Sequence, residues 1–264
     1  MNPVNKQQAR RKGAKRQAWH LGAGVALGIA AVGVGQPALA AVITTIDDFS
    51  DPQPILVADD AGTNPNQSLP LAGGMLGGTR VLYAEETTTS GASVDVSVVN
   101  STESYYGHSQ GAATGGYTRA IWDANGGCLN EDLSEATEIQ VRKISADHDA
   151  NIIVILSDGT NEASQLRSVN GSLDPVEETL AFQIAGFPGI GAVDLTDICS
   201  IQVEVDGRNV DVSAELDLRL DWVQYLENEE EPPPVPAISG IGLGAALLGL
   251  PLFGAMALRR RRRR

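Results

Sequence analysis

The first residues that could do chemistry lie in Gly107-His108-Ser109-Gln110-Gly111, which has the spacing G-x-S-x-G. In this pattern a serine stands on a sharp turn between a buried strand and a helix, where a histidine and an acid activate its hydroxyl group. The remaining partners follow in an allowed order along the chain: Asp123, Asp132 or Asp147, and then His148. Ser109 is therefore a candidate nucleophile, and a secreted hydrolase is one candidate function.

The sequence around Ser109 argues against that geometry. The polar segment 100–102 interrupts the apolar run before it, and Gly115-Gly116 would end a following helix within one turn. Only 39 residues separate Ser109 from His148, which is too few for the alternating strands and helices that such a hydrolase places between them. We therefore predict a flexible loop rich in Gly and Ser, and a protein that is not an enzyme.

The same stretch offers residues for a binding site. Tyr105, Tyr106, Tyr117 and Trp122 fall within eighteen residues of a chain that has few aromatics. Sugar rings stack on exposed aromatic faces, and a nearby acid such as Asp123 can accept hydrogen bonds from sugar hydroxyl groups. These five residues are candidate ligand-binding residues. Packing in the core is the competing use, above all for Trp122 and Tyr117.

Charge is unevenly distributed along the chain. All 33 acidic residues lie within residues 41–231 together with seven basic residues, so this region has a formal charge of −26. A surface this acidic repels phosphate backbones, which excludes nucleic acid as a partner. Divalent cations, salty surroundings and plain solubility are all compatible with it.

Residues 1–40 have the three parts of a signal peptide. A basic segment ending at Arg16 precedes the apolar run 21–35, and Ala38-Leu39-Ala40 supplies the small residues of a cleavage site. The apolar run is too short and too rich in Gly to span a membrane comfortably. We predict export by general secretion and cleavage after Ala40.

The exported region contains two cysteines, Cys128 and Cys199. Disulfides persist outside the cytoplasm, and a bridge between these two would close a long loop and contribute about 4 kcal/mol by the chain-entropy account. A disulfide is therefore predicted, with two separate buried thiols as the alternative.

The C-terminal tail has three consecutive parts. Residues 227–237 form an acidic, Pro-rich linker, residues 238–258 are uncharged and long enough for one transmembrane helix, and residues 259–264 are arginines that the positive-inside rule places in the cytoplasm. This arrangement resembles the PEP-CTERM sorting signals that exosortases process. The motif here is Val235-Pro236-Ala237-Ile238, in which Ala and Ile replace the last two residues of Val-Pro-Glu-Pro. The resemblance implies an exosortase-like processing enzyme as a partner, and a plain single-pass membrane anchor is the alternative.

Residues 41–226 form one domain in which apolar and polar residues alternate, as in half-buried strands. The alternating segments are 93–99, 179–184, 198–205 and 215–222. In the last segment we expect Leu216, Leu218, Leu220 and Trp222 to point inward, and Asp217, Arg219 and Asp221 to point outward. Segment 151–156 is apolar on both faces, which is typical of a central strand. The pattern predicts an all-β, antiparallel β-sandwich of about eight to ten strands.

Both ends of this domain resemble a galactose-binding-like jelly roll, the fold of many carbohydrate-binding modules. The matching segments are Ile46-Asp47-Asp48-Phe49 at the start, Gly77-Gly78-Thr79-Arg80 before the run 81–83, and Leu220-Asp221-Trp222-Val223 at the end. The resemblance implies that the first and last strands are neighbours and that a structural Ca²⁺ ion lies between an acid of each. Its ligands would be Asp47 or Asp48 and Asp221, with carbonyl groups and water supplying the other oxygens. The alternative is that these acids are ordinary exposed residues.

These observations predict an exported, non-catalytic protein that binds polysaccharide or contributes to an extracellular matrix. It would pass through an intermediate anchored in the inner membrane and then reach the periplasm, the cell surface or the matrix. A structural surface protein without a specific ligand is the first alternative, and a secreted hydrolase is the second.

Overall fold

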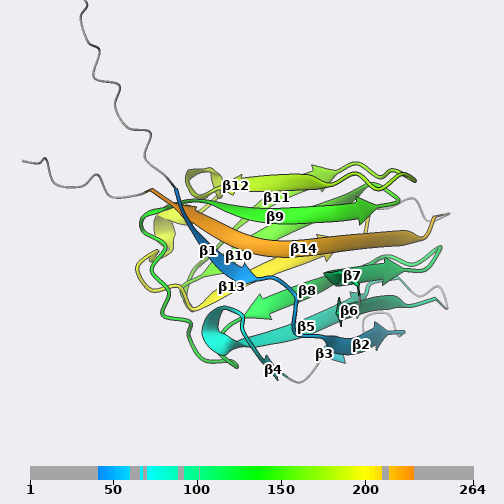
Figure 1. Ribbon diagram of the computed structural model, residues 1–264, viewed down its shortest axis with the longest axis horizontal. Coiled ribbons are helices and arrows are strands. Elements are labelled where there is room, and N and C mark those ends of the chain that lie inside the picture. The colour runs from blue at the N-terminus through cyan, green and yellow to red at the C-terminus, as the bar shows by residue number, and fades with distance from the viewer. Residues whose placement is uncertain are drawn as a thin grey trace, which may run out of the picture. The chain divides into compact units, whose positions relative to one another are not determined.

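The computed structural model describes residues 41–59, 66–67, 70–88, 92–100, 102–209 and 214–228, which form a sandwich of two antiparallel β-sheets (Figure 1). The predicted all-β, two-sheet class is confirmed. The described residues contain fourteen strands, seven in each sheet, which exceeds the eight to ten predicted. Strands as short as β3 (Asn66–Gln67) and β4 (Leu71–Ala72) contain too few residues to show an alternation, so no sequence pattern reveals them.

The first sheet, which we call sheet A, has the order β12-β9-β14-β7-β6-β2, with β1 also paired to β14. Its strands are β1 (Val42–Asp47), β2 (Gln53–Ala58), β6 (Val94–Asn100), β7 (Ser104–Gln110), β9 (Ala136–Ala146), β12 (Glu178–Gln183) and β14 (Leu216–Glu227). Strand β9 follows one edge of β14, while β7 and β1 share the other edge. The first and last strands are therefore neighbours, as the jelly-roll resemblance implied.

The second sheet, sheet B, has the order β11-β10-β13-β8-β5-β3, with β4 also paired to β5. Its longer strands are β5 (Thr79–Glu86), β8 (Gly116–Trp122), β10 (Ala150–Ser157), β11 (Glu162–Val169) and β13 (Ser200–Asp206). Strand β10 is paired on both sides, which confirms the prediction for segment 151–156. Three short 3₁₀ turns complete the described elements: η1 (Leu76–Gly78), η2 (Ile184–Gly186) and η3 (Ile190–Ala192).

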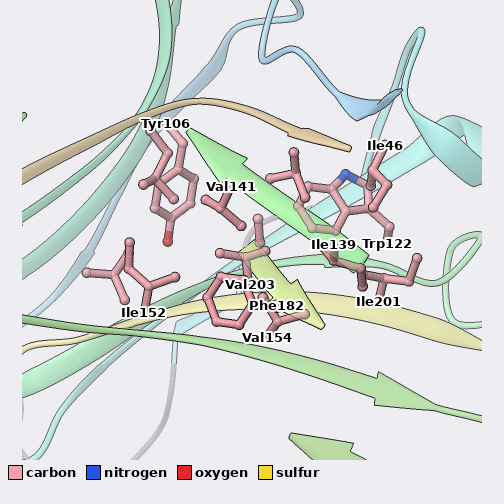
Figure 2. Packing of buried hydrophobic residues seen from close by; sticks show 14 of the residues in the cluster. Ile46, Tyr106, Trp122, Ile139, Val141, Ile152, Val154, Phe182, Ile201 and Val203 are labelled. Atoms are coloured by element: carbon pink, nitrogen blue, oxygen red, sulfur yellow. The ribbon is translucent and has the colours of Figure 1, made fainter. Parts of the chain in front are cut away.

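The core lies between the two sheets, and the inward members of the alternating segments form part of it together with residues such as Trp122, Ile139 and Val141 (Figure 2). The predicted inward residues that are buried include Val94, Val96, Val98, Leu180, Phe182, Ile184, Ile201, Val203, Val205, Leu216, Leu218 and Leu220. Trp122 and Tyr106 are the largest buried aromatic side chains, and both lie beside the Phe49 ring. The period-two pattern therefore located the part of the core that these four segments supply, but it did not identify other core residues such as Phe49, Ile139 and Val141.

Trp222 is the exception among the predicted inward residues. The register of β14 against β9 shifts between Leu220 and Trp222. A bulge of this kind inserts an extra residue, so the alternation beyond it is reversed. Val223 is consequently buried, while Trp222 is partly exposed, which corrects the prediction.

The predicted disulfide is confirmed between Cys128 and Cys199, and it ties the segment after β8 to the segment before β13. The signal peptide 1–40, the motif residues Val235 and Pro236, the predicted transmembrane segment 238–258 and the arginine block 259–264 lie outside the described residues. Among the residues that are described, no helix has the length and apolar character needed to cross a membrane.

Candidate functional site

Ser109 lies within strand β7 and not in a loop, which corrects the prediction for this stretch. Its neighbours across the sheet are Asp95 of β6 and Asp217 of β14. The serine is exposed on the outer face of sheet A, whereas His108 points into the core, where its Nδ1 lies 2.9 Å from Thr118 Oγ1. The chain has no turn at this serine, so the geometry of a nucleophile elbow is not formed.

The five predicted ligand-binding residues do not meet at one surface. Tyr106 and Trp122 are buried in the core (Figure 2), and Asp123 lies in the turn that follows β8. Tyr105 lies on the outer face of sheet A, and Tyr117 lies on the outer face of sheet B. Consecutive residues of a strand point to opposite faces, so Tyr105 and Tyr106 could not share one binding surface. Only Tyr105 and Tyr117 remain as aromatic candidates.

Tyr117 belongs to a network of side chains on sheet B that stack on, hydrogen-bond to and pair with one another. Its ring stacks on Tyr83 with 5.8 Å between the centroids, and the Arg119 and Arg208 guanidinium carbons lie 4.9 and 4.7 Å from the centre of its ring. Both tyrosine hydroxyl groups donate to Glu85, and the hydrogen bond from Tyr117 is the main reason that the pKa of Glu85 lies below its usual range. Both arginines also pair with acids of β13. This network therefore leaves little aromatic surface for a ligand.

A shallow hollow of about 140 Å³ lies on the outer face of sheet A, over strands β2, β6, β7 and β14. The strand registers place its residues in rows across the sheet. One row joins Asp95, Ser109 and Asp217, and the next joins Ser97, Gly107 and Arg219. We call this hollow the sheet A groove, defined by these six residues together with Tyr105 and Ile55.

Gly107 forms the floor of the sheet A groove because it has no side chain. A Cβ atom at this position would lie 3.3 Å from the Tyr105 ring and 3.6 Å from Ser97 Oγ. The partly exposed Tyr105 ring leans over Gly107, and the Arg219 guanidinium carbon lies 4.8 Å from its centroid. A contact of this kind at an exposed site contributes only about 0.5–1 kcal/mol, so a flat ligand can displace the guanidinium.

Asp95 supplies an unpaired acceptor in the groove. Its Oδ1 atom is buried and has no hydrogen-bond partner. Leaving a buried polar atom without a partner costs about 1–3 kcal/mol, and a ligand donor would recover that loss once the carboxylate turns toward the groove. The exposed side chains of Ser109 and Asp217 stand beside it in the same row. This end of the groove can therefore accept several hydrogen bonds from hydroxyl or amine groups.

An apolar surface continues the groove toward the edge of sheet A. A second, wider hollow of about 560 Å³ follows β2 and β6, and it shares Ile55 and Ser97 with the first. Ile55 is 62% exposed there, next to Pro54 and Val99. The combined surface is polar at β14 and apolar at β2, and it is long enough to contact more than one ring of an extended ligand.

The three acids predicted as calcium ligands have other partners in the structure. Asp47 is buried, and its Oδ2 accepts hydrogen bonds from Arg80 at 2.7 Å and from Trp122 Nε1 at 2.9 Å. Asp48 accepts from the Ser50 N–H, and Asp221 pairs with Arg142 at 3.3 Å. Because the buried Arg80 already neutralises Asp47, the arrangement of Asp47 does not fit a calcium ligand. Among the described residues, no group of three or more His, Cys, Asp or Glu side chains is placed to hold a metal ion. Calcium binding to this protein stays a prediction.

Among the residues of the sheet A groove, the sequence analysis proposed Tyr105 as a ligand-binding residue and Ser109 only as a candidate nucleophile. The missed residues are Ile55, Asp95, Ser97, Gly107, Asp217 and Arg219. The alternation did assign Asp217 and Arg219 to the outer face, and Asp95 and Ser97 occupy the outward positions between Val94, Val96 and Val98. The missing information was the strand order, which brings β6, β7 and β14 side by side.

No protein family and no curated protein sequence matches this chain. Solved structures with a similar arrangement include a family 11 carbohydrate-binding module from Clostridium thermocellum, in complex with a β-1,3-1,4-mixed-linked tetrasaccharide, at 13% identity and a TM-score of 0.38 over 74% of this chain and 100% of that one. The N-terminal cellulose-binding domain of Cellulomonas fimi β-1,4-glucanase C is 15% identical, with a TM-score of 0.34 over 72% and 99% of the two chains. A family 61 module in complex with β-1,4-galactotriose is 17% identical, with a TM-score of 0.33 over 56% and 88%. These similarities are too low to support an inference about ligand or activity.

Proposed function

We propose that this protein binds a polysaccharide without catalysing a reaction, and that the sheet A groove is the binding site. The observation that carries the proposal is the juxtaposition of the Tyr105 ring, the floor that Gly107 forms beneath it and the unpaired carboxylate oxygen of Asp95. A sugar ring has flat C–H faces that pack on aromatic rings and equatorial hydroxyl groups that donate to carboxylates. The apolar extension along β2 would accommodate a neighbouring sugar of the same polymer.

Charge narrows the class of polysaccharide. The region 41–231 has a formal charge of −26, and the groove itself contains Asp95 and Asp217 against the single cation Arg219. Polymers of uronic acids or sulfated sugars would be repelled over the whole domain. The proposed ligand is therefore a neutral or amino-substituted polysaccharide.

In this proposal the protein acts outside the cytoplasm. The Cys128–Cys199 disulfide is consistent with an oxidising compartment. The resemblance of the tail to a PEP-CTERM signal supports sorting by an exosortase-like enzyme, from an inner-membrane intermediate to the cell surface or matrix. The resemblance of the domain to a galactose-binding-like jelly roll agrees with a carbohydrate ligand.

The test is affinity electrophoresis in gels that contain a neutral glucan, a neutral galactan, an amino-sugar polymer or a polyuronate. Retention is expected in at least one of the first three gels and not in the last. Tyr105→Ala should weaken binding about tenfold, because the stacking it removes is about 1.4 kcal/mol. Gly107→Leu should abolish binding, because its side chain fills the floor of the groove.

Tyr83→Ala is the matched control, since it removes an aromatic ring from the outer face of the other sheet. Its binding should equal that of the unmodified protein. If no polymer retains a correctly folded protein, the alternative of a structural surface protein is supported. Retention that Tyr105→Ala and Gly107→Leu leave unchanged would place the binding site outside the groove.

A further inference from the structure

The short connection after β11 holds Asn170 and Gly171 against the turn that precedes β10. Asn170 is exposed, and its side chain makes no hydrogen bond within the described part of the chain. The N–H of Gly171 donates to Oδ1 of Asp149, with 2.7 Å between the two atoms. A Cβ atom at position 171 would lie 2.3 Å from the Cα atom of His148, so only glycine permits this close approach.

We propose that Asn170 deamidates in the folded protein, with Asp149 as the general base. The Gly171 nitrogen attacks Cγ of Asn170, and the new N–Cγ bond closes a succinimide ring. The proton of Gly171 passes to the Asp149 carboxylate and from there to Nδ2, the Cγ–Nδ2 bond breaks, and ammonia leaves. Water then opens the ring and leaves aspartate or isoaspartate at position 170. No oxidant, reductant or cofactor takes part.

The Asp149 carboxylate matters because a peptide N–H is a very weak acid and a poor nucleophile while it keeps its proton. A positioned general base accelerates such a step by about 10²- to 10⁴-fold. Asp149 is exposed and belongs to the turn between β9 and β10. Its Oδ1 accepts the hydrogen bond from the Gly171 N–H, which is the proton that must be removed.

The same chain contains a natural control. Asn125-Gly126 is the other Asn-Gly pair of the sequence, and both of its residues are exposed. Among the hydrogen bonds of the described residues, none joins the Gly126 N–H to a carboxylate. The two sites share the dipeptide and an exposed Asn side chain. They differ in the carboxylate acceptor and also in the backbone, because Asn125 and Gly126 both have positive φ (64° and 76°).

Conversion of Asn170 would change its surroundings. Asn170 lines a hollow of about 190 Å³ together with Asp149 and Asp206, so the new carboxylate adds a third negative charge there. Isoaspartate also adds a methylene group to the backbone between β11 and β12. Aged protein is expected to unfold at a slightly lower temperature than fresh protein, because like charges repel and the connection lengthens.

The experiment follows the full-length protein at neutral pH and physiological temperature. After the Cys128–Cys199 disulfide is reduced and alkylated, trypsin releases Asn170 in peptide 168–208 and Asn125 in peptide 120–142, and mass spectrometry counts the fraction of each peptide that gains about one dalton. Peptide 168–208 is expected to convert about tenfold faster or more, and Asn170→Gln should abolish its conversion. Asp149→Asn should slow it to the rate of peptide 120–142, and Asp149→Glu should restore part of the difference.

Circular dichroism establishes that each variant is folded, which the exposure of Asp149 leads us to expect. Equal rates for the two peptides of the unmodified protein would overturn the proposal. A rate at Asn170 that Asp149→Asn leaves unchanged would overturn the role of Asp149 as the base.

Discussion

Acidification is expected to destabilise this fold through His108. Its imidazole is buried, Nδ1 lies 2.9 Å from Thr118 Oγ1, and Nε2 has no hydrogen-bond partner. Burial disfavours the charged ring and lowers the pKa of His108 from 6.5 to about 4, against the weaker attraction of Asp206 and Asp147. The unfolded chain therefore takes up a proton near pH 6.5 that the folded chain does not accept until about pH 4. Stability is complete above this window and falls by about 3 kcal/mol as the pH decreases through it.

The variant His108→Gln isolates this contribution, because glutamine keeps an amide for Thr118 and does not titrate. The free energy of unfolding is measured in urea near pH 7 and near pH 4 for both proteins. The unmodified protein should lose about 3 kcal/mol more than the variant between the two conditions, since acids elsewhere contribute equally to both. Ser109→Ala, an exposed change in the same strand, is the control and should follow the unmodified protein.

Equal losses in the unmodified protein and His108→Gln would refute the reasoning, because they would mean that the folded chain protonates His108 as readily as the unfolded chain does. A larger loss in His108→Gln would refute it in the opposite direction. In that case Asp206 and Asp147 would stabilise the imidazolium more than burial destabilises it. An NMR titration of the His108 ring reports the same quantity directly and should have its midpoint near pH 4.

Three further predictions concern the parts that hold the sandwich together. Arg80→Met leaves the buried Asp47 carboxylate without its charge partner and should lower the free energy of unfolding by about 3–5 kcal/mol in urea titrations, and adding Asp47→Asn should restore part of that loss. Cys128→Ser opens a bridge between residues 71 positions apart and should cost about 4 kcal/mol, whereas the variant should show no further loss when a reductant is added. A chelator should lower the melting temperature if calcium binds near Asp48 and Asp221, and an unchanged midpoint contradicts calcium binding there.

The sequence was sufficient for the fold class because burial in a sandwich imposes a period of two on every long strand. Val94, Val96 and Val98 show that period clearly, and all three are buried. The pattern fails where the backbone departs from regular pairing. At Trp222 the alternation reverses, because the bulge in β14 depends on how β9 and β7 flank it and not on the local residues. The two-residue strands could not be recognised either, since pairing to β5 defines them.

The site was harder to predict because a groove on a sheet is made by neighbours across strands. Tyr105 is recognisable as an aromatic residue in the sequence. Its use as a binding residue depends on Gly107, which has no side chain to fill the groove, and on Asp95 of the neighbouring strand β6. In sequence Gly107 favours a loop, whereas in a strand a glycine also marks a place where another group approaches the backbone closely. Gly107 and Ser109, whose spacing in the sequence matches a nucleophile elbow, thus line a groove in the folded protein. Strand order, and not residue type, decides between those two interpretations.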